Sequence, residues 1–263
     1  MERLRWCAMA LKIAISSQKG GVAKTTTTLS LGAALAERGR SVLLVDLDPQ
    51  ANLTQSLGVD PDQLRRMIGD VLIDQASMLS VSRESSVFNL DLAPANHGLL
   101  VLDKVLYGRE GYEYRLKTSV QSINGGFYDV VIFDCPPAFS TLTINALTAS
   151  DLLIIPIPCE YYSARSLRSY LSLLHLVHQK TNPALRYRLL ITMYDGRSRI
   201  SRILLDQFRK TYGDTLFKTC ISIDVRLRES PIFGKPITQY APNARGAQEY
   251  RALAAELMAD ATH

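Results

Sequence analysis

A run of glycines and lysines near the start of the chain has the residue types that bind phosphate. The run, QKGGVAKTT, spans residues 18–26 and lies between an apolar stretch and a helical pattern. Backbone N–H groups at such a turn, with the N-terminus of the following helix, form a cradle for phosphate oxygens. Lys24 is expected to reach the β- and γ-phosphates, and the Thr25 hydroxyl to ligate Mg²⁺. The predicted cradle consists of Gly20, Gly21, Val22, Ala23, Lys24, Thr25 and Thr26.

This loop departs from the strict Walker A pattern. The two glycines of that pattern fall on Gln18 and Ala23, and Lys19 is an additional lysine at the start of the loop. A lysine there points away from the phosphates of its own loop and is better placed for a nucleotide held by a facing subunit. It would neutralise transition-state charge as an arginine finger does. If residue 23 has a positive φ, the β-carbon of Ala23 costs about 1 kcal/mol.

Three aspartates follow buried apolar stretches and could complete a nucleotide site. Asp46 and Asp48 end the stretch SVLLVDLD, and Asp134 ends YDVVIFD. In open α/β folds, ligand-binding groups lie at the carboxyl ends of the strands. We expect Asp134 to hold Mg²⁺ directly or through water, Asp46 to lie behind the metal ligands, and Asp48 to orient the attacking water.

The elements that must position these residues alternate between strands and helices. Apolar runs indicate strands at residues 11–17, 41–46, 128–134, 151–156 and 186–193, and a weaker pattern indicates another at 87–93. Helical patterns cover residues 25–38, 111–123, 140–149, 163–179, 200–212 and 246–259. Strands that are apolar throughout are buried on both faces, which predicts a mostly parallel twisted sheet with helices on both faces. We expect one α/β P-loop domain over residues 11–263, preceded by a flexible extension at residues 1–10.

The composition excludes several classes of protein. The 263 residues are 47% hydrophobic and 21% charged, which is typical of a globular domain. No apolar run approaches the roughly 18 to 20 residues of a membrane span, and the N-terminus lacks a signal-peptide pattern. We therefore expect a cytoplasmic protein. The four cysteines form no Cys-x-x-Cys pair, which argues against zinc and iron–sulfur chemistry.

Positive charge is concentrated in the C-terminal half. The net charge is +5, and residues 186–235 contain 11 basic and 5 acidic side chains. Such a field suits a polyanion. Phosphate contacts from these residues would give affinity that is independent of sequence and sensitive to salt. The candidate DNA-binding residues are Arg197, Arg199, Arg202, Arg226, Arg228 and Lys235.

Together, these segments resemble the ParA (Soj) partition ATPases, within the deviant-Walker class that also holds MinD. The segment CEYYS at residues 159–163 is similar to the family's Cys-Glu-Tyr-Tyr-Ala, and LITMYD at 190–195 is similar to its Leu-Leu-Thr-Met-Tyr-Asp. VRLRESP at 225–231 resembles Val-Arg-Leu-Ser-Glu-Ala-Pro. The resemblance covers residues 11–258.

This resemblance implies an ATPase that uses ATP and Mg²⁺, forms a homodimer with ATP and binds double-stranded DNA without sequence preference. A ParB-like partner would stimulate hydrolysis. By position, Lys19 is the signature lysine and Asp48 the catalytic aspartate, while Arg197 and Arg226 match positions at which the family contacts DNA. The family's Pro-Arg-Asn segment along the adenine is Ser-Ile-Asp here, which places Asp224 in the nucleotide site.

Other functions remain as alternatives. A membrane-associated positioning ATPase like MinD needs a basic amphipathic C-terminal helix. The tail EYRALAAELMADATH has one arginine against three acidic residues, so anionic lipid would repel it. An iron–sulfur reductase needs suitably spaced cysteines, which the chain lacks. A ParA-like protein that positions a cargo other than DNA is the remaining alternative. We expect no membrane partner and a location on the nucleoid.

Overall fold

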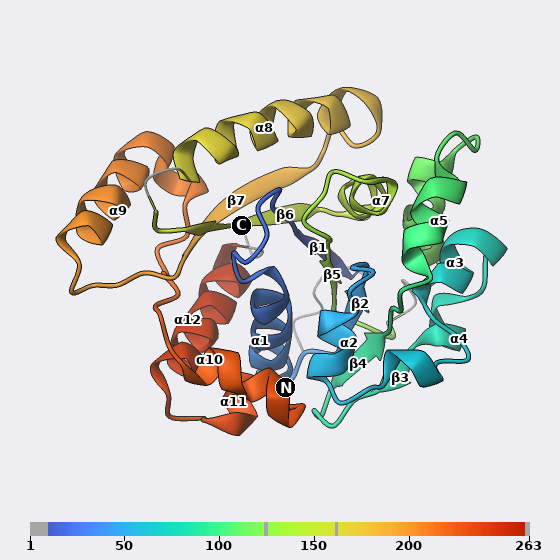
Figure 1. The fold of residues 1–263 in the computed structure, drawn as a ribbon, viewed down its shortest axis with the longest axis horizontal. Coiled ribbons are helices and arrows are strands. Elements are labelled where there is room, and N and C mark those ends of the chain that lie inside the picture. The colour runs from blue at the N-terminus through green and yellow to red at the C-terminus, as the bar shows by residue number, and fades with distance from the viewer. Residues whose placement is uncertain (1–9, 124–125, 161–162, 261–263) are drawn as a thin grey trace, which may run out of the picture.

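The computed structural model describes residues 10–123, 126–160 and 163–260 (Figure 1). The predicted extension at residues 1–10 therefore lies almost wholly outside the described residues. Within the described ranges, no helix is long and apolar enough to cross a membrane.

A sheet of seven strands forms the centre of the molecule, in the order β3-β4-β2-β5-β1-β6-β7. All neighbouring pairs are parallel except β3 and β4, which are antiparallel. The predicted mostly parallel sheet is confirmed. The strands are β1 (Leu11–Ile15), β2 (Val42–Asp46), β3 (Arg83–Glu84), β4 (Leu90–Ala93), β5 (Val130–Asp134), β6 (Leu152–Pro158) and β7 (Arg186–Thr192).

Successive residues of the central strands pack into two different cores, one on each face of the sheet. On β5, for example, Val131 and Phe133 belong to one core, and Val130 and Ile132 belong to the other. Side chains that alternate between two apolar layers explain why these strands are hydrophobic throughout. The strand sequences therefore bury apolar area on both faces at once.

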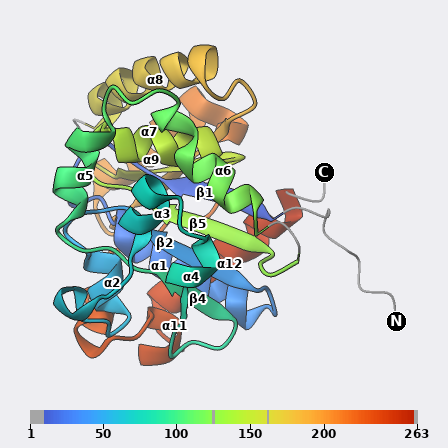
Figure 2. The same cartoon turned by 90° about the vertical axis from the view of Figure 1, so that its right-hand side faces the viewer.

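Helices cover both faces of the sheet (Figures 1 and 2). One core is closed by α1 (Lys24–Glu37), α2 (Asn52–Ser56), α10 (Arg226–Glu229), α11 (Ile237–Tyr240) and α12 (Arg245–Asp260). The other is closed by α3 (Ile68–Asp74), α4 (Met78–Val81), α5 (Leu99–Leu106), α6 (Arg115–Gln121), α7 (Thr141–Ala149), α8 (Ser163–Lys180) and α9 (Arg199–Tyr212). Four short 3₁₀ turns complete the described elements: η1 (Pro61–Gln63), η2 (Tyr112–Tyr114), η3 (Gly213–Thr215) and η4 (Ser230–Phe233).

Two predicted elements differ from the structure for local reasons. The strand expected at residues 87–93 begins only at Leu90, because Leu90 N–H donates to Val87 O and Asn89 has φ 61°, so the preceding residues form a turn. The helix expected at residues 111–123 is divided into η2 and α6. Gly111, at φ 66°, starts the 3₁₀ turn instead of an α-helix.

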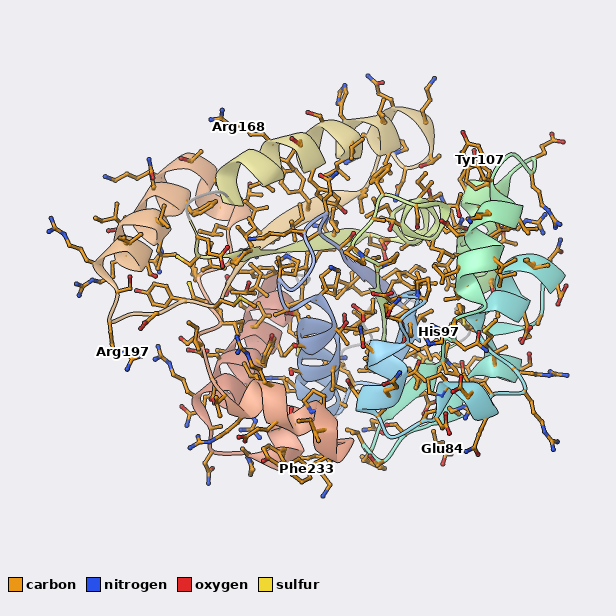
Figure 3. The ribbon with its side chains drawn as sticks, in the orientation of Figure 1. Glu84, His97, Tyr107, Arg168, Arg197 and Phe233 are labelled. Atoms are coloured by element: carbon orange, nitrogen blue, oxygen red, sulfur yellow. The ribbon has the colours of Figure 1, made fainter. Side chains whose placement is uncertain are left out.

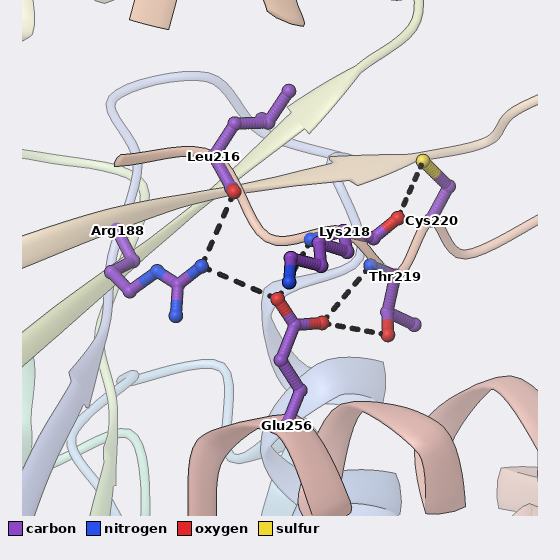
Figure 4. A network of polar contacts seen from close by, with 6 residues as sticks. All are labelled: Arg188, Leu216, Lys218, Thr219, Cys220 and Glu256. Atoms are coloured by element: carbon purple, nitrogen blue, oxygen red, sulfur yellow. Dashed lines mark hydrogen bonds and ion pairs between the residues drawn. The ribbon is translucent and has the colours of Figure 1, made fainter. Parts of the chain in front are cut away.

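The segment after α9 runs along the outer edge of β7 and leads toward the nucleotide site. Phe217 N–H donates to Leu189 O, and Ile221 N–H donates to Ile191 O. Figure 4 shows how α12 holds this segment: the Glu256 carboxylate accepts from the Arg188 guanidinium and from the backbone N–H of Lys218. These contacts fix the approach of residues 221–224 to the site.

Candidate nucleotide-binding site

The phosphate loop connects the end of β1 to the first residue of α1. Gly21 has φ 69° and Ala23 has φ 68°, so both lie in the left-handed region. The Ala23 carbonyl accepts the N–H of Thr27 and so begins the hydrogen-bond pattern of α1. The positive φ considered for residue 23 is therefore present, and an alanine occupies a conformation that glycine adopts with less strain.

The two lysines of the loop have different surroundings. Lys24 is buried, and its Nζ donates to the carbonyl of Lys19 at 3.2 Å. Burial lowers the pKa of Lys24, while the charges of Asp134 and Asp48 oppose that shift. The Lys19 side chain is 44% exposed, and its Nζ lies 2.7 Å from Glu160 Oε2. Lys24 thus belongs to the interior of the site and Lys19 to its outer surface, as the loop pattern predicts.

Asp134 ends β5 inside the site and is held by two threonines of α1. Thr25 Oγ1 donates to Asp134 Oδ2 at 2.7 Å, and Thr28 Oγ1 lies 3.2 Å from Oδ1. The carboxylate is completely buried. Burial, followed by the neighbouring charge of Asp46, raises the pKa of Asp134. Thr25 and Asp134, both predicted as metal ligands, are therefore in direct contact.

Asp46 and Asp48 lie at the end of β2, beside Asp134. In the sheet, Asp46 is the register partner of Asp134. Its Oδ2 accepts both the N–H and the hydroxyl of Thr54, at 2.9 and 2.7 Å, and its Oδ1 accepts Asp48 N–H. Asp46 therefore fixes the chain that follows β2. Asp48 lines the nucleotide cavity, and its Oδ1 accepts Gln50 N–H at 2.9 Å.

The oxygen donors at this position suit Mg²⁺. A hydroxyl and a carboxylate that touch each other, beside a phosphate loop, match a cation that binds few protein groups and completes its octahedron with phosphate and water. No group of three or more His, Cys, Asp or Glu side chains that could hold a metal occurs in the described part of the chain. A Mg²⁺ shared with a nucleotide needs no such cluster, so Thr25 and Asp134 fit the metal.

A cavity of about 560 Å³ is lined by the phosphate loop, the segment before α10, and α10 and η4 themselves. Its far end is lined by Met193, Ile223, Asp224, Leu227, Arg228 and Pro231. The Asp224 carboxylate accepts two backbone N–H groups, from Arg226 at 3.0 Å and Gly246 at 3.1 Å. Asp224 therefore lines the cavity and also joins the start of α10 to that of α12.

Glu249 of α12 holds the part of the cavity wall that contains Ser222 and Asp224. Its carboxylate accepts the N–H and the hydroxyl of Ser222, each at 2.7 Å, and the Arg245 side chain at 2.9 Å. Ser222 and Asp224 are thus both tied to the first turns of α12. The Ser-Ile-Asp segment is held rigidly by its own side chains.

The predicted DNA-binding residues fall into two groups. Arg199 and Arg202 lie on exposed positions of α9, and Arg226, Arg228 and Lys235 lie on exposed positions in and after α10. Arg197 lies just before α9 and projects from the outer edge of the molecule (Figure 3). Its side chain is 94% exposed and forms an ion pair with Asp195. Arg228 also lines the nucleotide cavity.

Several residues of the site were not predicted from the sequence. Thr28 follows Thr25 by three residues, a spacing that places both side chains on one face of a helix. The sequence could therefore have indicated that Thr28 faces the site together with Thr25. Thr54 contacts Asp46, which lies 8 residues away in sequence. Glu160 contacts Lys19 across 141 residues, and Glu249 contacts Ser222 across 27. No local pattern in the sequence indicates these contacts. Gln50 and Asn52 line the cavity beside the predicted residues.

Comparisons with known proteins place this site in a family. A family model described as an AAA domain matches residues 10–187. The sporulation initiation inhibitor protein Soj of Bacillus subtilis is 42% identical over 249 residues, covering 94% of this chain and 98% of that protein. The chromosome partitioning protein ParA of Caulobacter vibrioides is 36% identical over 248 residues, covering 94% and 93%. The chain belongs to the ParA/Soj family of P-loop ATPases.

The solved structures agree with this ParA/Soj assignment. A structure of cobyrinic acid a,c-diamide synthase from Mycobacterium smegmatis, with a bound ATP analogue and magnesium, has a TM-score of 0.83 and 38% identity. The match covers 95% of this chain and 94% of that one. The synthase name belongs to that protein. What this ParA/Soj-type chain shares with it is the α/β fold around the phosphate loop.

Proposed function

We propose that the chain is a DNA-partitioning ATPase whose ATP-bound dimer binds DNA of any sequence and hydrolyses ATP when a ParB-like partner stimulates it. The ParA/Soj membership makes it an ATPase, and an ATP analogue and magnesium are bound in a structural neighbour. The observation that carries the proposal is the separation of the two lysines. Lys24 is buried in the phosphate site, and Lys19 stands outside it on the surface.

In the proposed reaction, each residue of the site has one task. The N–H groups of residues 20–25 and the Lys24 ammonium bind the phosphates. Thr25 and Asp134 would hold Mg²⁺, which neutralises phosphate charge when it is bound. Asp48, fixed by the N–H of Gln50, orients the attacking water. Because Asp48 is buried, its carboxylate keeps one orientation. A fixed carboxylate holds the water in a position from which it can attack the γ-phosphate in line.

Lys19 completes the site only in a dimer. Its exposed Nζ pairs with Glu160, whereas the buried Lys24 Nζ donates to the Lys19 carbonyl. In a sandwich of two chains with their nucleotides between them, each Lys19 would reach the partner's phosphates. Charge that develops on the transferred phosphoryl group would then be balanced only after dimerisation. Slow hydrolysis by the isolated chain follows from this arrangement.

Dimerisation also explains how ATP would control DNA binding. Arg197, Arg226 and their neighbours give one chain a handful of phosphate contacts, which are weak at cellular salt because log affinity falls by roughly 0.9 per contact per decade of salt. Two such patches on one dimer make the second set of contacts intramolecular, which can raise affinity by about 10² to 10⁴. No new contact within either chain is required.

Charge reversal tests the DNA-binding surface. With ATP and Mg²⁺ present, Arg197→Glu and Arg226→Glu are each expected to weaken binding to all random duplexes and to reduce the salt slope by about one. Arg83→Glu is the matched control, because Arg83 is exposed on β3, at the opposite edge of the sheet from β7. Equal effects of all three changes, or strong preference of the wild type for one sequence, would contradict the proposed surface.

A further inference from the structure

A buried tyrosine of α8 joins the two loops that face the nucleotide. Tyr170 Oη donates to Ser16 Oγ at 2.7 Å. Ser16 follows the last residue of β1 and begins the phosphate loop, and Tyr170 is only 3% exposed. Burial raises the pKa of Tyr170, so the hydroxyl keeps its proton and remains a donor at neutral pH. This hydrogen bond spans 154 residues of sequence.

The same tyrosine contacts the second loop, which follows Asp134. Its ring meets that of Phe139 edge to face, with centroids 6.4 Å apart and planes at 79°. Phe139 lies between Pro137, which lines the nucleotide cavity, and the first residue of α7. An edge-to-face contact between the buried Tyr170 ring and the partly buried Phe139 ring fixes the relative position of the two elements that carry them. Tyr170 therefore packs against both loops.

Ser16 itself is held from several directions. Its N–H donates to Ile154 O on β6, at 3.2 Å. Its hydroxyl also interacts with the thiol of Cys135, where it opposes the rise in pKa caused mainly by burial of that thiol. Ser16 thus links β6, α8 and the residue after Asp134. A small cavity next to this junction is lined by Tyr170 and by the segment from Ser17 to Lys19.

We infer that Tyr170 is a positioning residue of the ATPase, which acts through Ser16 to fix the segment that carries Lys19. Residues 20–24 are anchored separately, by the start of α1 and by the hydroxyl of Thr192, which donates to Val22 O. The tyrosine hydroxyl therefore governs where Lys19 leaves the loop more than how the cradle binds phosphate. The inference rests on the role proposed for Lys19 in hydrolysis.

The test compares two buried tyrosines that each lose one hydroxyl. Tyr170→Phe removes the bond to Ser16 and keeps the ring contact with Phe139. Tyr250→Phe is the matched control, because Tyr250 is fully buried and its Oη lies 3.0 Å from Thr27 Oγ1 on α1, away from the Lys19 segment. Steady-state ATPase kinetics, thermal unfolding and ATP-dependent dimerisation are measured for both variants.

Tyr170→Phe is expected to lower kcat by about three- to tenfold, the range that loss of one positioning hydrogen bond allows, with KM for ATP within twofold. Tyr250→Phe is expected to leave kcat within twofold. Its melting temperature should fall by about as much as that of Tyr170→Phe, because each variant loses one buried hydrogen bond. Equal kcat for the two variants, or a change confined to KM, would overturn the inference.

Ser16→Ala provides a second route to the same result. It removes the acceptor of the bond, so its kcat should match that of Tyr170→Phe, and the double variant should be no slower than either single one. Independent losses that multiply in the double variant would contradict a shared role. Lys19→Ala separates the two proposals: if it hydrolyses ATP normally, the role of Lys19 fails, whatever Tyr170→Phe does.

Discussion

Lys19 Nζ lies 2.7 Å from Glu160 Oε2, so the lysine proposed to act on a facing subunit is held by a carboxylate of its own chain. Both side chains are about half exposed, and an exposed ion pair of this kind contributes only about 0 to 1 kcal/mol. The contact can therefore break when a second nucleotide-bound chain approaches. In the proposed dimer, Lys19 would exchange the Glu160 carboxylate for a phosphate of the partner's nucleotide.

Removing the charge of Glu160 should favour the dimer. With Glu160→Gln, Lys19 no longer leaves an ion pair in order to reach the partner's phosphates, so the ATP-dependent dimer should tighten by up to about fivefold. Sedimentation equilibrium with a non-hydrolysed ATP analogue measures this change. Glu37→Gln is the control, since it breaks the exposed ion pair of Arg251 with Glu37 on α1. A weaker dimer for Glu160→Gln would show that Glu160 supports the interface.

Replacing Ala23 should stabilise the protein. Ala23 has φ 68°, and glycine adopts this conformation without the steric cost of a β-carbon. Ala23→Gly should therefore raise the free energy of unfolding by about 1 kcal/mol, as measured by urea denaturation. Ala33→Gly, within α1, should lower it by at least that amount, since glycine is unfavourable inside a helix and the change also removes a buried methyl group. Destabilisation by both changes would mean that the Ala23 methyl group makes a compensating contact.

Binding and hydrolysis should separate between two residues of the site. Asp48→Ala should retain ATP binding and dimerisation but lose at least about 10²-fold in hydrolysis, since it removes the group that orients water. Lys24→Ala should lose nucleotide binding itself, because the buried ammonium pairs with the phosphates. Fluorescent ATP titration and phosphate release measure the two steps. Loss of binding in Asp48→Ala would assign that residue to phosphate or metal binding.

The nucleotide-free protein should become less stable as the pH rises toward 8. Burial and the charge of Asp46 raise the pKa of Asp134 from 3.8 to about 8, so the folded chain keeps a proton that the unfolded chain has released. Where the folded state binds more protons, stability falls with increasing pH. Thermal unfolding without Mg²⁺ should show this trend between pH 6 and 8. Asp134→Asn should flatten it, and Asp60→Asn, at the exposed start of η1, should not. An equal slope in all three proteins would contradict the assignment.

The sequence alone predicts the sheet and the phosphate loop well because their signals are local. β2, β5 and β6 are continuous apolar runs, and Asp46 and Asp134 come at the ends of two of them. The short helices between residues 52 and 106 were not predicted. α4 has only four residues and α2 has five, too few for a helical period to emerge from the pattern.

The missing parts of the site have a common physical cause. Glu160 reaches Lys19 and Tyr170 reaches Ser16 across 141 and 154 residues, so only the folded arrangement of β1, β6 and α8 brings these pairs together. Asp224 illustrates the opposite case. Its place beside the nucleotide was predicted by resemblance, whereas its two backbone contacts depend on how α10 and α12 meet.

The most direct test of the account is the affinity for random double-stranded DNA measured over a salt series with ATP, with ADP and without nucleotide. The account predicts tight binding with ATP, with a steep salt slope, and affinity weaker by about 10² or more in the other two states, where single chains present one basic patch each. The ATP-bound affinity should be the same for duplexes of unrelated sequence. Equal affinity in all three nucleotide states would contradict the claim that ATP controls DNA binding through dimerisation.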